Sequence, residues 1–165
     1  MAVRRVLRHL LMPDWRARSC FPPAVLARIE AAIAEAERGH GGELRFAVEA
    51  ALDLAPLLRG MSARERALEV FSQLRVWDTE ANNGVLIYLL LADHDVEIVA
   101  DRDVDRRVGR AEWERICREM EACFRDGRFE DGAITGIRAV GALLARHYPG
   151  DHGDRNELPD SPAML

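Results

Sequence analysis

The sequence of 165 residues contains no lysine, so all 23 of its basic residues are arginines. This absence excludes a lysine Schiff base and a phosphate-loop lysine, and it leaves arginine as the only strongly cationic ligand for phosphate. With 28 acidic residues the formal charge is −5, which argues against general affinity for nucleic acid. No apolar run approaches the ~20 residues that span a bilayer, so we expect no integral membrane association.

Cysteine is scarce, and no pair has the Cys-x-x-Cys spacing. Cys20, Cys117 and Cys123 therefore indicate buried thiols in a reducing compartment, and we expect a cytoplasmic protein without a signal peptide. The sequence also lacks the motifs of nucleophile-elbow serine hydrolases, zinc peptidases, phosphate loops and dinucleotide-binding loops. No nucleophile stands beside a base that the sequence suggests.

The spacing of apolar residues predicts helices and strands in an alternating order. Apolar residues recur with helical spacing, or alternate as in strands, to give the order helix, strand, helix, strand, strand, helix, helix. The predicted helices lie within 25–36, 62–74, 113–124 and 134–148, and the predicted strands within 44–50, 85–92 and 96–101. This order predicts an α/β protein, a three-layer α/β/α sandwich with a mixed sheet of three to four strands.

The chain ends differ in composition from the middle. We expect an N-terminal helix and linker over 1–20, one α/β domain over 21–149 and a polar C-terminal tail over 150–165. The N-terminal helix has one apolar face, which we expect to dock onto the domain, with contact to a membrane surface or a protein partner as the alternative. This face is formed by Val3, Val6, Leu7, Leu10 and Leu11.

Strand connections bring polar residues to one end of the predicted sheet. The strand 44–50, the helix that begins at a capping box at Ser62 and the strand 85–92 form a βαβ unit, whose strands run parallel. The strands 85–92 and 96–101 form an antiparallel hairpin. Glu43 therefore lies at the same end as Asn83, and the hairpin returns Asp101 to that end.

Carboxylates and amide oxygens at this end are the ligands that Ca²⁺ and Mg²⁺ prefer. We therefore predict a divalent-cation site to which Glu43 adds a further carboxylate, with Arg75 and Arg102 nearby as cationic groups for a bound phosphate. The predicted ligands are Asp78, Asn82, Asn83, Asp101 and Asp103.

Two alternatives to that site stay open. Asp101, Asp103 and Asp105 with Glu112 follow much of the spacing of an EF-hand loop, but Arg106 replaces its glycine, so only a looser site with Asp105 or Glu112 is considered. In the other alternative, the acidic residues are a solvated loop without a ligand. The hairpin tip Asp93–His94–Asp95 is interpreted as a polar turn.

The order and spacing of several segments resemble the TPM domain family. They are Arg75–Thr79, Asn82–Ile87, Glu97–Arg102, Phe124 with Gly127 followed by a helix, and the tail Asn156–Asp160, which is similar to a short soluble branch of the family. The resemblance implies an α/β/α sandwich that binds calcium or another divalent cation and acts as a binding or assembly module for an unknown partner. As the alternative, it implies a low-activity metal-dependent acid phosphatase that uses the same pocket.

Overall fold

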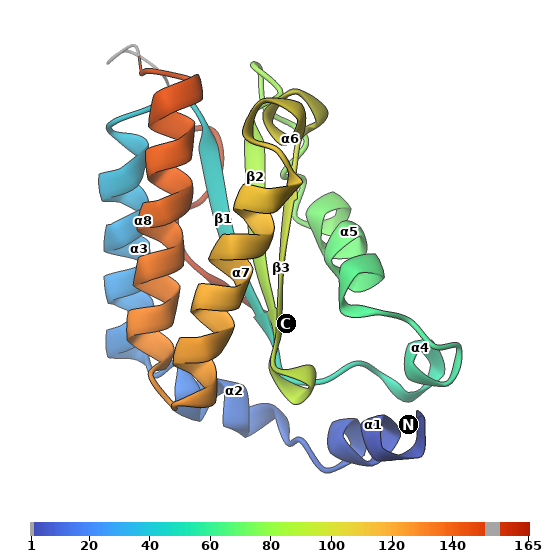
Figure 1. Ribbon diagram of the computed structural model, residues 1–165. Coiled ribbons are helices and arrows are strands. Elements are labelled where there is room, and N and C mark those ends of the chain that lie inside the picture. The colour runs from blue at the N-terminus through green and yellow to red at the C-terminus, as the bar shows by residue number, and fades with distance from the viewer. Residues whose placement is uncertain (1, 151–155) are drawn as a thin grey trace.

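A four-stranded mixed sheet forms the centre of the computed structural model, which describes residues 2–150 and 156–165 (Figure 1). In chain order its strands are β1 (Glu43–Glu49), β2 (Gly84–Leu90), β3 (Asp95–Ala100) and β4 (Ala163–Met164). The spatial order is β3-β2-β1-β4, in which β1 runs parallel to β2 and β4, and β3 runs antiparallel to β2. The predicted parallel pair and hairpin are confirmed, and the C-terminal tail supplies an edge strand.

Helices cover both faces of the sheet. Figure 1 shows α3, α7 and α8 on one face and α5 on the other, which confirms the predicted α/β/α sandwich. The helical elements in chain order are α1 (Ala2–Leu10), α2 (Asp14–Cys20), α3 (Pro23–Glu37), α4 (Leu54–Leu58), α5 (Ala63–Gln73), the 3-10 turn η1 (Leu91–Asp93), α6 (Arg102–Val108), α7 (Arg110–Arg125) and α8 (Phe129–His147).

Every residue of β1 and β2 is buried, as expected for parallel strands that are covered on both faces. Leu44, Phe46 and Val48 of β1 join the larger core with α3, α7 and α8. The opposite face of the sheet packs in a smaller core with α4, α5 and Leu158 from the tail. The helical spacing of apolar residues within 62–74 predicts a buried face that includes Leu68; this prediction is wrong, because Val70 occupies the core and Leu68 is exposed.

Two segments differ from the sequence prediction. The acidic return after β3 is the helix α6 and not a loop, with Asp101 at its N-cap. Asp103 and Asp105 lie in its first turn and Arg106 and Arg107 in its last, and these four placements suit the helix dipole, whereas Arg102 at its first residue opposes it. After Leu11–Pro13 the chain also resumes helical structure as α2, where we expected a linker.

The docking of α1 reverses the predicted orientation. The helix contacts η1 and α4, but the side chains that it turns toward the protein are Arg5, Val6 and His9. The predicted apolar docking face is therefore wrong, because most of that face is exposed. The pairing of buried polar groups at Asp93, described below, decides the orientation.

Replacement of Gly84 by alanine should destabilise the fold strongly. A Cβ atom at Gly84 would lie 2.0 Å from the carbonyl oxygen of Val76, a backbone atom that cannot rotate away. We expect Gly84→Ala to lower the free energy of unfolding by about 3 kcal/mol, measured by urea denaturation. The control Gly39→Ala places its Cβ 3.5 Å from the nearest atom and should change stability by less than about 0.5 kcal/mol. Equal stability of the two variants would contradict the prediction.

Candidate functional site

The segment between α5 and β2 has an unusual backbone. Arg75 and Asn82 adopt φ values of 54° and 50°, in the left-handed region that residues other than glycine rarely occupy. The segment is held by Thr79, whose hydroxyl accepts the N–H of Asn83 at 3.2 Å. These contacts give the approach to β2 a fixed shape, with Asn83 buried at its end.

Asn83 links the starts of β1 and β2. Its side-chain amide donates to the carbonyl of Gly41, and its own carbonyl accepts the N–H of Glu43 at 3.3 Å. The side-chain oxygen of Asn83 is buried and meets no donor among residues 2–150 and 156–165. A buried oxygen in this state is a free acceptor for a cation or another donor.

Asp101 lies directly beside this turn. One carboxylate oxygen accepts the N–H of Gly84 at 2.8 Å, and the N–H of Asp101 donates to the carbonyl of Gly84 at 3.0 Å. Burial raises the pKa of Asp101, while the bond from Gly84 opposes this effect. The structure therefore brings Asp101 to the residue that follows Asn83, as the hairpin register predicts.

Asp103 is held by other groups. Its carboxylate accepts the hydroxyl of Tyr148 at 2.6 Å and pairs with Arg107 at 2.8 Å and Arg106 at 3.3 Å. The hydroxyl of Tyr148 and the two arginines keep the pKa of Asp103 below its usual value. Asp103 thus has partners that a cation would have to displace.

The remaining predicted residues lie around this end of the sheet. Asp78, Asn82, Arg75 and Arg102 are exposed, and their side chains form no hydrogen bond or ion pair with another described residue. The described part of the chain contains no group of three His, Cys, Asp or Glu side chains arranged to hold a metal ion. Among the alternative ligands, Asp105 accepts the indole N–H of Trp113, and Glu112 pairs with Arg115.

Glu43 binds the C-terminal tail. It is 6% exposed, and its two carboxylate oxygens accept the N–H groups of Glu157 and Leu158 at 3.1 and 3.0 Å. Arg45, two residues later on the same face, donates to the carbonyls of Pro159 and Ser161. Glu43 therefore anchors residues 114 positions later in the chain, a role that no local sequence pattern indicates.

Glu37 at the end of α3 is a second polar group beside the tail. Its carboxyl oxygen accepts the N–H of Leu44 at 2.8 Å. Burial raises the pKa of Glu37 to about 8, against the effect of the Leu44 bond, and the nearby Glu43 and Asp160 raise it further. Glu37 is therefore largely protonated at neutral pH.

Three more carboxylates gather along the edge strand β3, around a cleft of about 660 Å³. The pKa of Asp95 is raised to about 6, mainly by burial and further by the nearby carboxylates of Glu97 and Glu121. Glu121 accepts the edge N–H of Val96 at 3.2 Å, and Arg64 donates to the carbonyl of Ile98. Side chains thus occupy the exposed backbone groups of this edge, which protects it from pairing with another strand.

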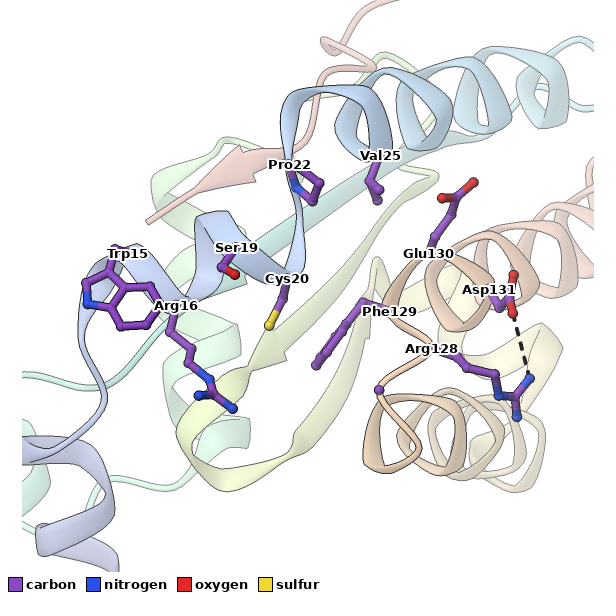
Figure 2. Close-up of a pocket in the computed structure, with 11 residues that line it drawn as sticks. Trp15, Arg16, Ser19, Cys20, Pro22, Val25, Arg128, Phe129, Glu130 and Asp131 are labelled. Atoms are coloured by element: carbon purple, nitrogen blue, oxygen red, sulfur yellow. Dashed lines mark ion pairs between the residues drawn. The ribbon is translucent and has the colours of Figure 1, made fainter.

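A further cleft, of about 700 Å³, lies between α2 and the start of α8 (Figure 2). Figure 2 shows Trp15 and Arg16 on the α2 side and Glu130 and Asp131 on the α8 side. Both carboxylates have cationic partners, Arg28 for Glu130 and Arg128 for Asp131. Burial raises the pKa of the Cys20 thiol in this cleft, which disfavours the reactive thiolate.

The raised pKa of Glu37 predicts a pH dependence of stability. The folded protein keeps a proton on Glu37 that the unfolded chain releases above a pKa of about 4.5. The contribution of Glu37 to the free energy of unfolding is therefore complete below pH 4.5 and is lost as the pH rises through about 8. We expect Glu37→Gln to reduce the fall in the free energy of unfolding between pH 6 and 8.5 by about 2 kcal/mol, measured by urea denaturation. The exposed Glu35→Gln on the same helix is the control, and an unchanged fall in Glu37→Gln would refute the assignment.

No described helix is both long and apolar enough to cross a membrane.

Comparison with known proteins agrees with the architecture. Comparison of the sequence with curated proteins finds no match. The solved structure of BA42 protein from the psychrophilic bacterium Bizionia argentinensis is similar, with 28% identity, a TM-score of 0.74 and coverage of 85% of this chain and 92% of that chain.

A second solved structure, the N-terminal domain of a protein from P. gingivalis, shares the fold. It has 17% identity and a TM-score of 0.60, and the alignment covers 78% of this chain and 80% of that chain. The sequence model of the TPM domain matches residues 18–143, which is most of the chain. The protein described above therefore belongs to the TPM domain family.

Proposed function

We propose that this TPM-domain protein binds a divalent cation, Ca²⁺ or Mg²⁺, beside the start of β2 and acts as a binding or assembly module. The observation that carries the proposal is the contact of Asp101 with Gly84, the residue that follows Asn83. The side-chain oxygen of Asn83 is buried and has no hydrogen-bond donor among the described residues. Both groups are oxygen donors of the kind that these cations prefer. Asp78 and Asn82 are exposed on the adjoining segment and are the additional candidate ligands.

The small number of protein donors supports a role in binding a partner. Ca²⁺ takes six to eight oxygen ligands, more than Asp101 and Asn83 can supply. Water, or carboxylates of another molecule, would fill the other positions. A cation held in this way would link this end of the sheet to an acidic partner.

Cation binding should raise thermal stability in a manner that depends on Asp101. A cation at about 100 times its dissociation constant adds roughly 2.7 kcal/mol to the free energy of unfolding, which raises the melting temperature by several degrees. We expect chelator-treated protein to show this rise with Ca²⁺ or Mg²⁺, and Asp101→Asn to lose it. The measurement is thermal unfolding followed by circular dichroism.

Asp103→Asn is the matched control, because Asp103 already pairs with Tyr148 and Arg107. We expect this variant to keep most of the response. A wild-type protein that does not respond to either cation at millimolar concentration would overturn the proposal. An equal loss in both variants would show that the two aspartates bind the cation together.

A second candidate function, hydrolysis of phosphomonoesters, is favoured by two arginines. Arg75 and Arg102 are exposed at this end of the sheet and make no ion pair with another described residue, so both are available for a phosphate group. A divalent cation supplies Lewis acidity for such a reaction. We expect any cation-dependent turnover of p-nitrophenyl phosphate to fall at least tenfold in Arg102→Gln and to be unchanged in Arg146→Gln, where a helix-end arginine is replaced.

We also propose a cytoplasmic location. The cysteines Cys20, Cys117 and Cys123 are free thiols. Burial raises the pKa of the Cys117 thiol to about 12, so this group stays in its unreactive form. Free, partly buried thiols suit a reducing compartment.

A further inference from the structure

The helix α1 presents all of its large apolar side chains except Val6 to solvent. The exposed fractions are 72% for Val3, 51% for Leu7 and 59% for Leu10, and Leu11 just beyond the helix is 77% exposed. Residues spaced by three and four positions lie on one face of a helix, so these side chains form a continuous strip. An amphipathic helix that docks onto its own domain normally buries this strip.

Polar contacts on the opposite face of α1 hold it in this orientation. Arg5, Arg8 and His9 each contact the carboxylate of Asp93, at 2.8, 3.0 and 3.1 Å. The other ring nitrogen of His9 accepts the N–H of Leu52 at 2.9 Å, and His9 is 3% exposed. Since burying Asp93 and His9 without partners would be costly, the polar face of α1 is the one that docks.

Other exposed apolar side chains lie on helices at the same end of the molecule (Figure 1). The helix α4, which contacts α1, exposes Leu54 and Leu58 on one face, and Trp15 at the start of α2 is 63% exposed. Figure 1 shows α1, α2 and α4 at the end of the molecule remote from α6. Seven of the ten large apolar side chains exposed in the described residues lie here. We call these seven the apolar end: Val3, Leu7, Leu10, Leu11, Trp15, Leu54 and Leu58.

The charge of the N-terminal segment is opposite to that of the rest of the chain. Residues 1–20 contain five arginines and one aspartate, whereas the remaining residues contain 18 arginines and 27 acidic residues. Arg4, Arg16, Arg18 and Arg59 are exposed around the apolar end. Arg16 lies next to Trp15, on the side of the cleft away from Glu130 and Asp131 (Figure 2).

We propose that the apolar end binds the surface of an anionic lipid bilayer. Leucines that enter the bilayer surface, an aromatic side chain beside them and arginines that contact lipid phosphates are the features of an interfacial amphipathic helix. A second copy of the chain is a poorer fit, because it would bring two sets of arginines together. The opposite charge of anionic lipids matches these arginines.

Flotation with lipid vesicles tests the proposal. We expect the full chain to bind vesicles of phosphatidylcholine with about 30% phosphatidylglycerol. Binding to vesicles of pure phosphatidylcholine, or to the anionic vesicles at high salt, should be much weaker. Leu7→Glu with Leu11→Glu should weaken binding to the anionic vesicles at least tenfold. Leu68→Glu, which replaces an exposed leucine of α5 outside the apolar end, is the matched control and should bind as the wild type does.

Quenching of tryptophan fluorescence by brominated lipids gives an independent measurement. We expect quenching that is lost in Trp15→Phe and retained in Trp77→Phe, since Trp77 is exposed elsewhere, in the segment before β2. All of these variants change exposed side chains and should keep the wild-type melting temperature. Measuring the melting temperature therefore identifies any variant that fails to fold.

Several outcomes would overturn the proposal. The proposal fails if the wild type does not float with anionic vesicles, or if the glutamate variant floats as well as the wild type does. It also fails if sedimentation shows that the wild type is a dimer that does not bind vesicles and that the glutamate variant is a monomer. The apolar end would then be an interface between copies of the chain. A vesicle-negative wild type that binds an acidic peptide through Arg4 and Arg16 would assign the surface to a protein partner.

Discussion

The pairing of buried charges on β1 is the constraint on which much of the structure depends. Glu43, Arg45 and Glu49 lie on one face of a strand that is buried on both faces, and unpaired charges there would cost several kcal/mol. Glu49 meets Arg66 of α5 at 2.9 Å and the hydroxyl of Tyr88 at 2.5 Å. Backbone groups of the tail bind both carboxylate oxygens of Glu43 and one terminal nitrogen of Arg45, whereas the buried Nε of Arg45 has no partner among the described residues. The positions of α5 and of residues 156–161 therefore follow from the polar face of one central strand.

The same strand shows how far the sequence predicts the fold. Alternation along 44–50 correctly predicts a strand, and the short connection at 92–95 correctly predicts the β2–β3 hairpin, because both signals are local. Alternation with charged residues normally indicates a half-exposed strand, yet β1 is fully buried. Part of the reason lies in tail residues more than 100 positions away, which cover Glu43 and Arg45, and no periodic pattern marks them. Leu158 and the two residues of β4 belong to the same long-range arrangement.

The candidate site was predictable to the extent that strand register determines it. The pairing of Val85 with Ala100 places Asp101 beside Gly84, so one carboxylate could be located from the sequence. Asp103 lies only two residues further on, but α6 turns it toward Tyr148 and Arg107. The acidic residues in the first turn of α6 and the arginines in its last turn suit the helix dipole. In the sequence, the same acidic residues also have the spacing of a calcium-binding loop, and this obscured the helix. The buried oxygen of Asn83 depends on packing and is visible only in the structure.

The orientation of α1 illustrates a general limit of amphipathic patterns. A helical strip of leucines shows that one face needs an apolar environment, but it does not say whether the protein or another phase provides it. Here the domain offers α1 the largely buried carboxylate of Asp93, and Arg5 and Arg8 of α1 pair with it. The leucines are consequently left for an external surface. Because β1 and β2 run parallel from the candidate cation site toward η1, that surface lies at the opposite end of the sheet (Figure 1). A chain that binds a bilayer through α1 would therefore hold Asp101 and Asn83 away from the lipid, where a partner in solution can reach them.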